Sequence, residues 1–236
     1  MIKINNLTKL YGNHKALDIP HCAIEQGEVI GLVGNNGAGK TTLFRLMLDL
    51  LEPSTGEVLL QGVNVVTNED WKEHVGAYID NSFLIDYLTA EEFFYFIGQV
   101  YHLSQADINQ RLVRFHQLMN DEILGKDKYI RDFSAGNKQK IGIIAAMLHQ
   151  PSIVILDEPF NFLDPRSQAI IKRVIKEYST EFGTTILISS HNLNHTIDVS
   201  TRILLLEKGL LLKDVQNSSQ EAREEIENYF NEEFIE

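Results

Sequence analysis

A glycine-rich segment at residues 34–41, with the sequence Gly-Asn-Asn-Gly-Ala-Gly-Lys-Thr, constrains the fold of this chain more than any other feature. It matches the pattern G-x-x-x-x-G-K-[ST] and follows the short apolar run Glu28–Val33. Helical spacing begins directly after it, at Leu43, Leu46, Met47 and Leu50. This strand–loop–helix context predicts a phosphate-binding loop rather than a glycine-rich turn with a lysine nearby.

The residue types of this loop suit the phosphate groups of a nucleotide. Its glycines let successive backbone N–H groups turn inward around phosphate oxygens, and the start of the helix adds its positive end. Lys40 brings a point charge to the terminal phosphates, and the Thr41 hydroxyl is suited to ligate Mg²⁺. The residues expected to contact the nucleotide are Gly34, Asn35, Asn36, Gly37, Ala38, Gly39, Lys40, Thr41 and Thr42.

An acidic pair after a second apolar run is suited to bind the metal ion and activate the water that nucleotide hydrolysis needs. Ile153–Leu156 is typical of a buried strand, and the carboxyl ends of such strands form the edge of the sheet where ligands bind. We expect Asp157 to hold Mg²⁺, in part through water, and Glu158 to polarise the attacking water. A helix cap is the alternative for an Asp-Glu pair, and the phosphate loop upstream favours the catalytic interpretation.

The rest of the chain alternates apolar strands with helical stretches, the pattern of an α/β protein with a mostly parallel sheet. Thr185–Ser189 is predicted to form a strand, and Ile203–Leu206 and Leu210–Val215 are predicted to form a hairpin. Residues 83–149 have the pattern of helices with little strand. We therefore expect one domain, residues 1–236, with a helical insertion subdomain at 83–149.

Three further helices have recognisable signals. Asp164 followed by Pro165 predicts a capped helix, and Ser104 with Asp107 predicts another. The helix that begins at Ser104 is expected to carry Ile108, Leu112, Phe115 and Met119. Within residues 217–236, apolar side chains at helical spacing among glutamates predict an acidic amphipathic helix over Ala222–Phe234. Its apolar stripe is expected to pack on the chain's own core, with contact to a partner as the alternative.

Charge and composition narrow the classes of partner. A formal net charge of −12 disfavours broad binding to a nucleic-acid backbone and direct adhesion to anionic lipid. No run approaches the roughly 20 apolar residues that cross a bilayer, and the first residues lack a secretory signal. The single cysteine, Cys22, is interpreted as a small buried apolar residue and fits a reducing cytoplasm. We therefore expect no nucleic-acid partner and no direct lipid anchor.

A third motif selects among the protein classes that use such a phosphate loop. Residues 133–140, Phe-Ser-Ala-Gly-Asn-Lys-Gln-Lys, resemble the signature sequence of ABC ATPases, usually written L-S-G-G-Q. The resemblance covers the chain from Tyr11 to the hairpin near Val215. It implies a P-loop NTPase core with an N-terminal antiparallel β portion and a helical insertion, and ATP hydrolysis with ATP and Mg²⁺ as cofactors.

Other positions resemble elements of the same family in the same order. Tyr11 stands where ABC proteins carry an aromatic residue that stacks on adenine, with a core residue as the alternative. Asp80 lies in the loop that usually holds a glutamine, where it is expected to be a third metal ligand. Leu163-Asp164 matches the loop that runs between two subunits. His191 matches the switch histidine, with a buried structural histidine as the alternative.

The signature explains why the resemblance implies a pair of chains. Ser134 and Gly136 precede a helix with apolar residues on one face, so backbone N–H groups there form a second anion site. In ABC proteins this site closes over the γ-phosphate held by the other subunit's phosphate loop. One chain then has only half of each ATP site, and a homodimer or a heterodimer is implied.

Three residues depart from the pattern of the family. Asn137 replaces the glutamine of the signature and Phe133 its leucine, whereas the Ser-x-Gly part is kept. Asp80 is the larger change, because an aspartate is shorter than glutamine and charged. It still has the oxygen atoms to ligate a metal, but the role of a sensor that links the site to the helical insertion is in doubt.

The resemblance implies that the load moved by ATP hydrolysis is a separate, integral membrane permease. The chain would then be a peripheral subunit at the cytoplasmic face of the cell membrane. Val75–Asp80 and Leu88–Glu91 look like export-type bacterial subunits, although import stays open. Aromatic residues in this region are expected to serve mostly as core, with docking to the permease as the alternative. They are Phe83, Tyr87, Phe93, Phe94, Tyr95, Phe96 and Tyr101.

Two rival functions remain for comparison. A soluble ABC ATPase that moves no solute, such as an iron–sulfur assembly subunit, also has a single cassette and is the main alternative. A GTPase is disfavoured because its Asn-Lys-x-Asp motif is missing: Asn137, Lys138 and Gln139 are followed by Lys140.

Overall fold

The structure is a computed structural model that describes residues 1–217, and they divide into two compact units. The first unit combines residues 1–71 with the chain from Thr185 onward, and the second consists of residues 72–184. The acidic helix predicted at Ala222–Phe234 lies outside the described residues. Each unit is described by itself below.

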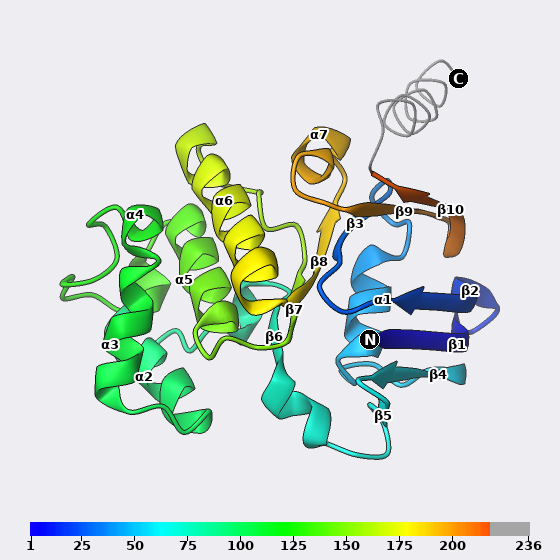
Figure 1. Ribbon diagram of the computed structural model, residues 1–236, viewed down its shortest axis with the longest axis horizontal. Coiled ribbons are helices and arrows are strands. Elements are labelled where there is room, and N and C mark those ends of the chain that lie inside the picture. The colour runs from blue at the N-terminus through cyan, green and yellow to red at the C-terminus, as the bar shows by residue number, and fades with distance from the viewer. Residues whose placement is uncertain (218–236) are drawn as a thin grey trace. The chain divides into compact units, whose positions relative to one another are not determined.

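The first unit is built around a mixed sheet in the strand order β5-β4-β1-β2-β10-β9-β3-β8. The N-terminal strands pair antiparallel, as β1 with both β2 and β4, and lie side by side in Figure 1. Strand β3 pairs parallel with β8 on one side and β9 on the other, and β9 and β10 form the predicted hairpin. The strands are β1 (Ile2–Tyr11), β2 (His14–Ile24), β3 (Val29–Val33), β4 (Thr55–Leu60), β5 (Val63–Asn64), β8 (Thr185–Ser190), β9 (Arg202–Glu207) and β10 (Leu210–Gln216).

Among the residues of this unit up to 217, the α-helices are α1 (Lys40–Met47) and α7 (Leu193–Ile197). All five residues of β3 are buried, as expected for a parallel strand covered on both faces. At the start of β9, the half-buried guanidinium of Arg202 donates to the Glu28 carboxylate at 3.1 Å and to Asp214 at 2.6 Å. These bonds tie the C-terminal hairpin to the chain just before β3, so the two ends of the chain form one unit.

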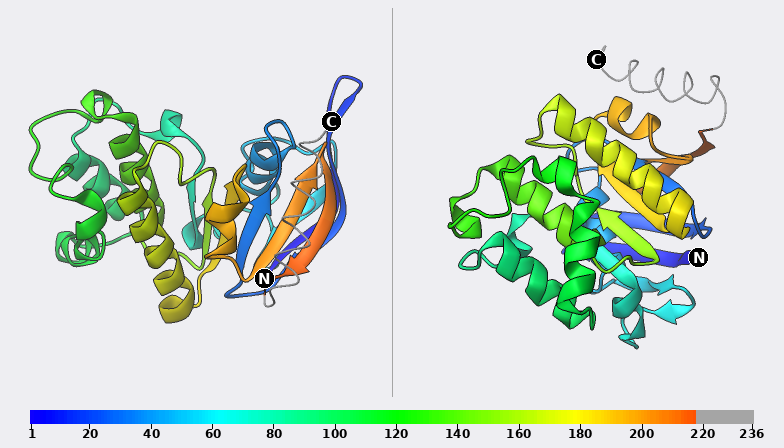
Figure 2. Two further views of the ribbon diagram at one scale, coloured as in Figure 1. Left: turned by 90° about the horizontal axis from the view of Figure 1, so that it is seen from above. Right: turned by 60° about the vertical axis from the view of Figure 1, so that its left-hand side comes forward.

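The second unit contains a parallel pair of strands, β6 (Val75–Tyr78) and β7 (Ile153–Leu156), and most of the helices. Figure 2 shows its longest described helix, α6, as a straight yellow-green coil beside the green helices. The α-helices are α2 (Ala90–Val100), α3 (Gln105–Val113), α4 (His116–Met119), α5 (Ala135–Met147) and α6 (Pro165–Phe182). The 3-10 helices of the chain are η1 (Asp70–His74), η2 (Asn81–Phe83) and η3 (Ile130–Asp132).

Two sequence-based expectations about helices are wrong in detail. Helix α1 ends at Met47 rather than continuing to Leu50, because Asp49 adopts a left-handed backbone with φ of 52° and Leu50 lies exposed beyond it. The helix expected from Ser104 through Met119 is two helices. The break occurs at Phe115, a fully buried ring whose centroid lies 6.2 Å from that of Tyr178.

The aromatic residues of the helical region fall into two groups. Phe93 and Phe94 are buried, and Tyr95 and Tyr101 are half-buried, so the core takes fewer members of this set than expected. The exposed members are Phe83, Tyr87 and Phe96. Within residues 1–217 no helix is both long enough and apolar enough to span a membrane.

Candidate functional site

The structure distributes the predicted site residues over both units. Tyr11, the phosphate loop and His191 belong to the first unit. The second unit holds the remaining positions, which are Asp80, Ser134, Gly136, Asp157 and Glu158.

The phosphate loop has the backbone that its glycines predict. Gly37 and Gly39 adopt φ values of 84° and 110°, which other residues rarely reach. Gly34 follows β3 directly, and a Cβ atom there would collide with the carbonyl oxygen of Leu206. The loop therefore runs close to strand β9 and turns sharply into helix α1, as the strand–loop–helix motif requires.

Lys40 is buried inside this loop, with only 6% of its surface exposed. Its ammonium group donates to the carbonyl oxygen of Gly34 at 2.7 Å and to that of Asn35 at 3.3 Å. A buried ammonium needs polar partners of this kind. The loop thus holds one positive charge at the point where the chain enters helix α1.

The start of helix α1 fits an anion. Its N-cap, Gly39, makes no side-chain capping bond, and its first turn contains no acidic residue. By contrast, α2, α3, α5 and α6 begin with side-chain oxygens that accept from their own first turns. A helix N-terminus carries a partial positive charge, so with Lys40 this end of α1 presents two attractive elements to a phosphate.

Tyr11 lies at the end of β1, with 52% of its surface exposed. The ammonium of Lys9 stands 5.3 Å from the centre of its ring. The alternative that Tyr11 is a core residue is wrong. An exposed ring at the rim of the sheet is suited to stack on a flat heterocycle.

His191 follows the last residue of β8 and is exposed, so the alternative of a buried structural histidine is wrong. A small turn fixes the chain after it: the backbone N–H of Asn192 donates to the Ser190 hydroxyl at 2.9 Å. The turn therefore fixes the backbone on both sides of His191, directly after the carboxyl end of the buried strand β8.

In the second unit, Asp157 and Glu158 follow β7 as predicted. Asp157 is 6% exposed, and its backbone N–H donates to the carbonyl oxygen of Tyr78 at 2.8 Å. Glu158 is half-buried and has a left-handed backbone, with φ of 48°. Its carbonyl oxygen accepts from the Gln139 side chain at 2.8 Å and from the backbone of Asn161 at 3.2 Å. A buried carboxylate followed by a partly accessible one matches a metal ligand next to a base.

Asp80 lies in the loop after β6, where it caps the short helix η2. Its carboxylate accepts from the backbone N–H of Ser82 at 2.8 Å and also from the Ser82 hydroxyl. The Asp80 carboxylate therefore serves as the cap of η2 in this structure.

The signature segment forms the capped start of helix α5. The Ser134 hydroxyl accepts from the backbone N–H of Asn137 at 3.3 Å. A Cβ atom on Gly136 would lie 2.6 Å from the carbonyl oxygen of Phe162, so glycine is required for the close approach of these two segments. The structure therefore brings the signature next to the loop that ends at Asp164.

That loop, residues 158–164, carries an exposed aromatic ring and ends in a helix cap. Phe162 has φ of 61° and is 72% exposed. Asp164 accepts from the backbone N–H of Ser167 at 3.0 Å and from its hydroxyl at 2.6 Å, and these bonds lower the pKa of its carboxyl. Helix α6 thus begins as the sequence predicts.

A preformed metal cluster is not among the described residues: none of them form a group of three or more His, Cys, Asp or Glu side chains suited to one ion. Mg²⁺ in nucleotide sites is bound through one or two protein groups, with the rest of its ligands from phosphates and water. The predicted ligands Thr41 and Asp157, a hydroxyl and a carboxylate, fit that pattern.

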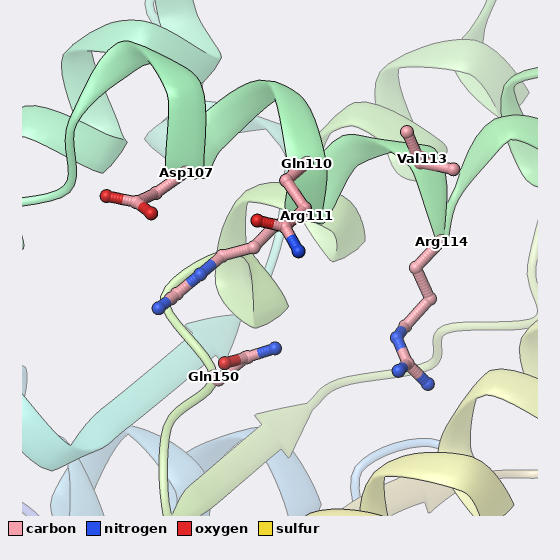
Figure 3. Close-up of a pocket in the computed structure, with 6 residues that line it drawn as sticks. All are labelled: Asp107, Gln110, Arg111, Val113, Arg114 and Gln150. Atoms are coloured by element: carbon pink, nitrogen blue, oxygen red, sulfur yellow. The ribbon is translucent and has the colours of Figure 1, made fainter.

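A separate hollow of about 480 Å³ lies beside helix α3 (Figure 3). Figure 3 shows Arg111 on this helix and Arg114 just after it, with Gln150 below Arg111. Arg111 donates to the carbonyl oxygen of Leu148 at 3.2 Å, and Arg114 pairs with Glu181 at 2.8 Å, so each guanidinium already has a partner within the chain.

Two residues in contact with the predicted site were missed as individual residues by the sequence analysis, Tyr78 and Gln139. Gln139 is 3% exposed and Tyr78 is 5% exposed, and their side chains bond to each other. The sequence offers no clear signal for Gln139, which stands between Lys138 and Lys140 in the polar first half of the signature helix.

Known proteins with the same arrangement identify the family. A family model described as "ABC transporter" matches residues 17–161. The bacitracin transport ATP-binding protein BcrA of Bacillus licheniformis is 32% identical over 216 residues, which cover 91% of this chain and 69% of the relative. A solved structure described as the ATP binding subunit of an ABC transporter has a TM-score of 0.83 and 27% identity, and covers 92% of this chain and 90% of that chain.

A dimeric ATP-binding cassette, MJ0796, solved with ADP and phosphate, shares the fold, with a TM-score of 0.82 at 23% identity over 93% of this chain and 100% of that chain. The family model covers more than half of the chain, and the phosphate loop within it has the expected geometry. The chain belongs to the ABC transporter family and is an ATP-binding subunit with the ATPase fold of that family.

Proposed function

We propose that this chain binds Mg-ATP through its phosphate loop, hydrolyses it as part of a dimer and drives transport through a separate membrane permease. The observation that carries the proposal is the start of helix α1. There a buried ammonium group, two left-handed glycines and an uncapped helix end coincide. These three features together suit the terminal phosphates of a nucleoside triphosphate.

The proposal gives each predicted site residue one role. Lys40 and the backbone of the phosphate loop hold the phosphates, and Tyr11 stacks on the adenine. Thr41 and Asp157 ligate Mg²⁺, with Asp80 as a third ligand. Glu158 orients and polarises the attacking water, and His191 contacts the γ-phosphate during hydrolysis. General-base assistance of this kind is worth about 10²–10⁴-fold in rate.

The dimer follows from the signature. The backbone N–H groups at Ser134 and Gly136 are proposed to cover the γ-phosphate of ATP bound to a second subunit. This second subunit is either another copy of the chain or a related one. The solved dimeric cassette supports such pairing in proteins of this fold.

Transport is proposed in the direction of export, at the cytoplasmic face of the cell membrane. The relative named for bacitracin transport supports a transport function, and the export-like segments Val75–Asp80 and Leu88–Glu91 support the direction. Attachment is proposed to occur through protein contacts with the permease, because a net charge of −12 opposes adhesion to anionic lipid. No nucleic-acid partner is proposed, for the same electrostatic reason.

The test replaces the proposed base with its neutral isostere. Glu158→Gln should bind ATP with normal affinity but hydrolyse it at least about 10²-fold more slowly, because the attacking water loses its base. With Mg-ATP it should accumulate as a dimer in size-exclusion chromatography. Glu73→Gln, at an exposed glutamate of η1, is the matched control and should hydrolyse ATP normally. Near-normal turnover by Glu158→Gln would remove Glu158 from this role.

A further inference from the structure

The backbone of Glu158 is held in a conformation that a glutamate rarely adopts. Its φ of 48° lies in the left-handed region, where a side chain crowds the main chain. Two donors fix its carbonyl oxygen, the Gln139 amide at 2.8 Å and the Asn161 backbone N–H at 3.2 Å. Unusual backbone conformations persist where surrounding contacts determine them, and they gather at active sites.

Gln139 is the side chain that reaches Glu158 from another element. It lies in helix α5, 3% exposed, and is 19 residues away in sequence. Because its Nε2 donates to the carbonyl oxygen of Glu158, its Oε1 must face the other way. There it lies 3.1 Å from the hydroxyl of Tyr78, whose single proton is shared between this oxygen and Oδ1 of Asn81, 2.8 Å away. Both ends of this buried amide thus face a polar partner, which determines its orientation.

Tyr78 is anchored as firmly as Gln139. Its ring lies against Gly142 in α5, where any Cβ atom would collide with it. Its carbonyl oxygen accepts from the backbone of Asp157, and its hydroxyl also lies 2.8 Å from Oδ1 of Asn81.

We propose that Tyr78 and Gln139 are positioning residues for ATP hydrolysis, acting through the backbone of Glu158. The inference rests on the proposed role of Glu158 as the base. The bonds form a series from the loop after β6, through the signature helix, to the residue that follows Asp157. A displacement of about 1 Å at a reacting group costs up to about 10²-fold in rate, so fixing this backbone has a direct effect on turnover.

The first test separates turnover from binding. Gln139→Leu removes both bonds at similar volume, and Tyr78→Phe removes the hydroxyl but keeps the ring on Gly142. The kcat of each at saturating Mg-ATP should fall about tenfold or more, while the Kd for ATP changes by no more than about twofold. Tyr178→Phe is the matched control, because it deletes another buried hydroxyl bond in the same unit, 2.9 Å from the Met147 carbonyl, and should keep its kcat.

The second test asks whether the effect passes through the Glu158 side chain. In the Glu158→Gln background, adding Gln139→Leu should slow hydrolysis no further, because residues that act as a unit are not additive. Equal losses in both backgrounds, or a parallel loss of ATP binding and melting temperature, would overturn the inference in favour of a structural role. If Gln139→Leu does not fold, Tyr78→Phe is placed in the same cycle.

The outcomes also separate this inference from the proposed function. Slow hydrolysis by Glu158→Gln together with normal hydrolysis by Gln139→Leu and Tyr78→Phe would overturn the positioning role alone. Normal hydrolysis by Glu158→Gln would overturn the proposed base, and the positioning role with it.

Discussion

Lys40 is the residue whose removal should most directly affect nucleotide binding, because its ammonium group is buried within the phosphate loop. Hydrogen bonds that involve a charged group are worth about 1.5–3 kcal/mol, so Lys40→Ala should weaken ATP binding about 10- to 100-fold. Titration calorimetry measures the change. Lys3→Ala, at an exposed position of β1, should bind ATP as the native chain does. Unchanged affinity in Lys40→Ala would mean that this loop is not the site.

His149 should make the stability of the protein depend on pH. Its ring stacks on Tyr101, with centroids 3.5 Å apart. Burial lowers its pKa to about 4, although the Val75 backbone acts in the opposite direction; the charge of Arg111 adds to the lowering. In the unfolded chain the His149 imidazole binds a proton near pH 6.5, whereas in the folded chain it does so only near pH 4.

The stability contributed by this neutral histidine is therefore complete above about pH 6.5 and is lost as pH falls toward the folded pKa. Between about pH 7.5 and pH 5 the native chain should lose about 2 kcal/mol more unfolding free energy than His149→Phe, which keeps an aromatic ring but does not titrate. Urea denaturation at several pH values measures both slopes. Parallel slopes would contradict the prediction, whatever the absolute stability of the variant.

At the scale of single residues, the sequence predicts those whose partners are near in the chain. Asp164 bonds to Ser167 three residues later, and Gly37 and Gly39 act through their own backbone. Gln139 was not recognised, because its partners Tyr78 and Glu158 come from distant segments. Such a role depends on which segments meet, and one sequence does not contain that information in readable form.

Helix α2 illustrates how a local signal determines an element. The Thr89 hydroxyl accepts from the backbone N–H of Glu92, and the Glu92 carboxylate accepts from the backbone N–H of Thr89. This reciprocal capping box satisfies two groups that the start of a helix otherwise leaves unpaired. Thr89→Ala should lower the unfolding free energy by about 1 kcal/mol, measured by chemical denaturation. Thr89→Ser, which keeps the hydroxyl, should stay close to the native value, and equal losses in both would refute the cap.

Strands and helix starts were predictable at this scale, but helix ends were not. Buried strands such as β3 and β7 appear in the sequence as short apolar runs, and the N-cap residues Ser104 and Asp164 mark the starts of α3 and α6. The break between α3 and α4 leaves no such sign, because the apolar spacing continues through Phe115. There the packing of one buried ring on Tyr178 overrides helical periodicity.

For the whole molecule, the proposed attachment to a permease predicts a change in cellular distribution. Phe83 is 53% exposed in the segment after Asp80, and a charge there would oppose an apolar contact. Phe83→Glu should move the protein from the membrane fraction to the supernatant when it is expressed with its genomic neighbours, and should leave ATP affinity unchanged. Val113→Glu, at an apolar residue of α3 that is 72% exposed, is the matched control and should stay with the membranes.

If the native protein itself stays in the supernatant and co-purifies with no integral membrane protein, the transport proposal fails. A soluble ABC ATPase would then be the better explanation.

The fold class and the family were predictable at this scale, because several motifs occur in a set order along the chain. The contacts between segments far apart in the sequence were not predictable. One example is the hydrogen bond from the Asp18 backbone N–H to the carbonyl oxygen of Gly209, which joins strand β2 to the C-terminal hairpin.

Cys22 has a practical consequence for following such a molecule at work. It is the one cysteine of the chain, it is 5% exposed, and burial raises its pKa to about 11. Maleimides react with accessible thiolates, so near neutral pH they should leave the native protein unlabelled. A cysteine introduced at an exposed position would then accept a fluorophore or a spin label without any other substitution. Two copies labelled in this way would report their separation directly as nucleotide is bound and released.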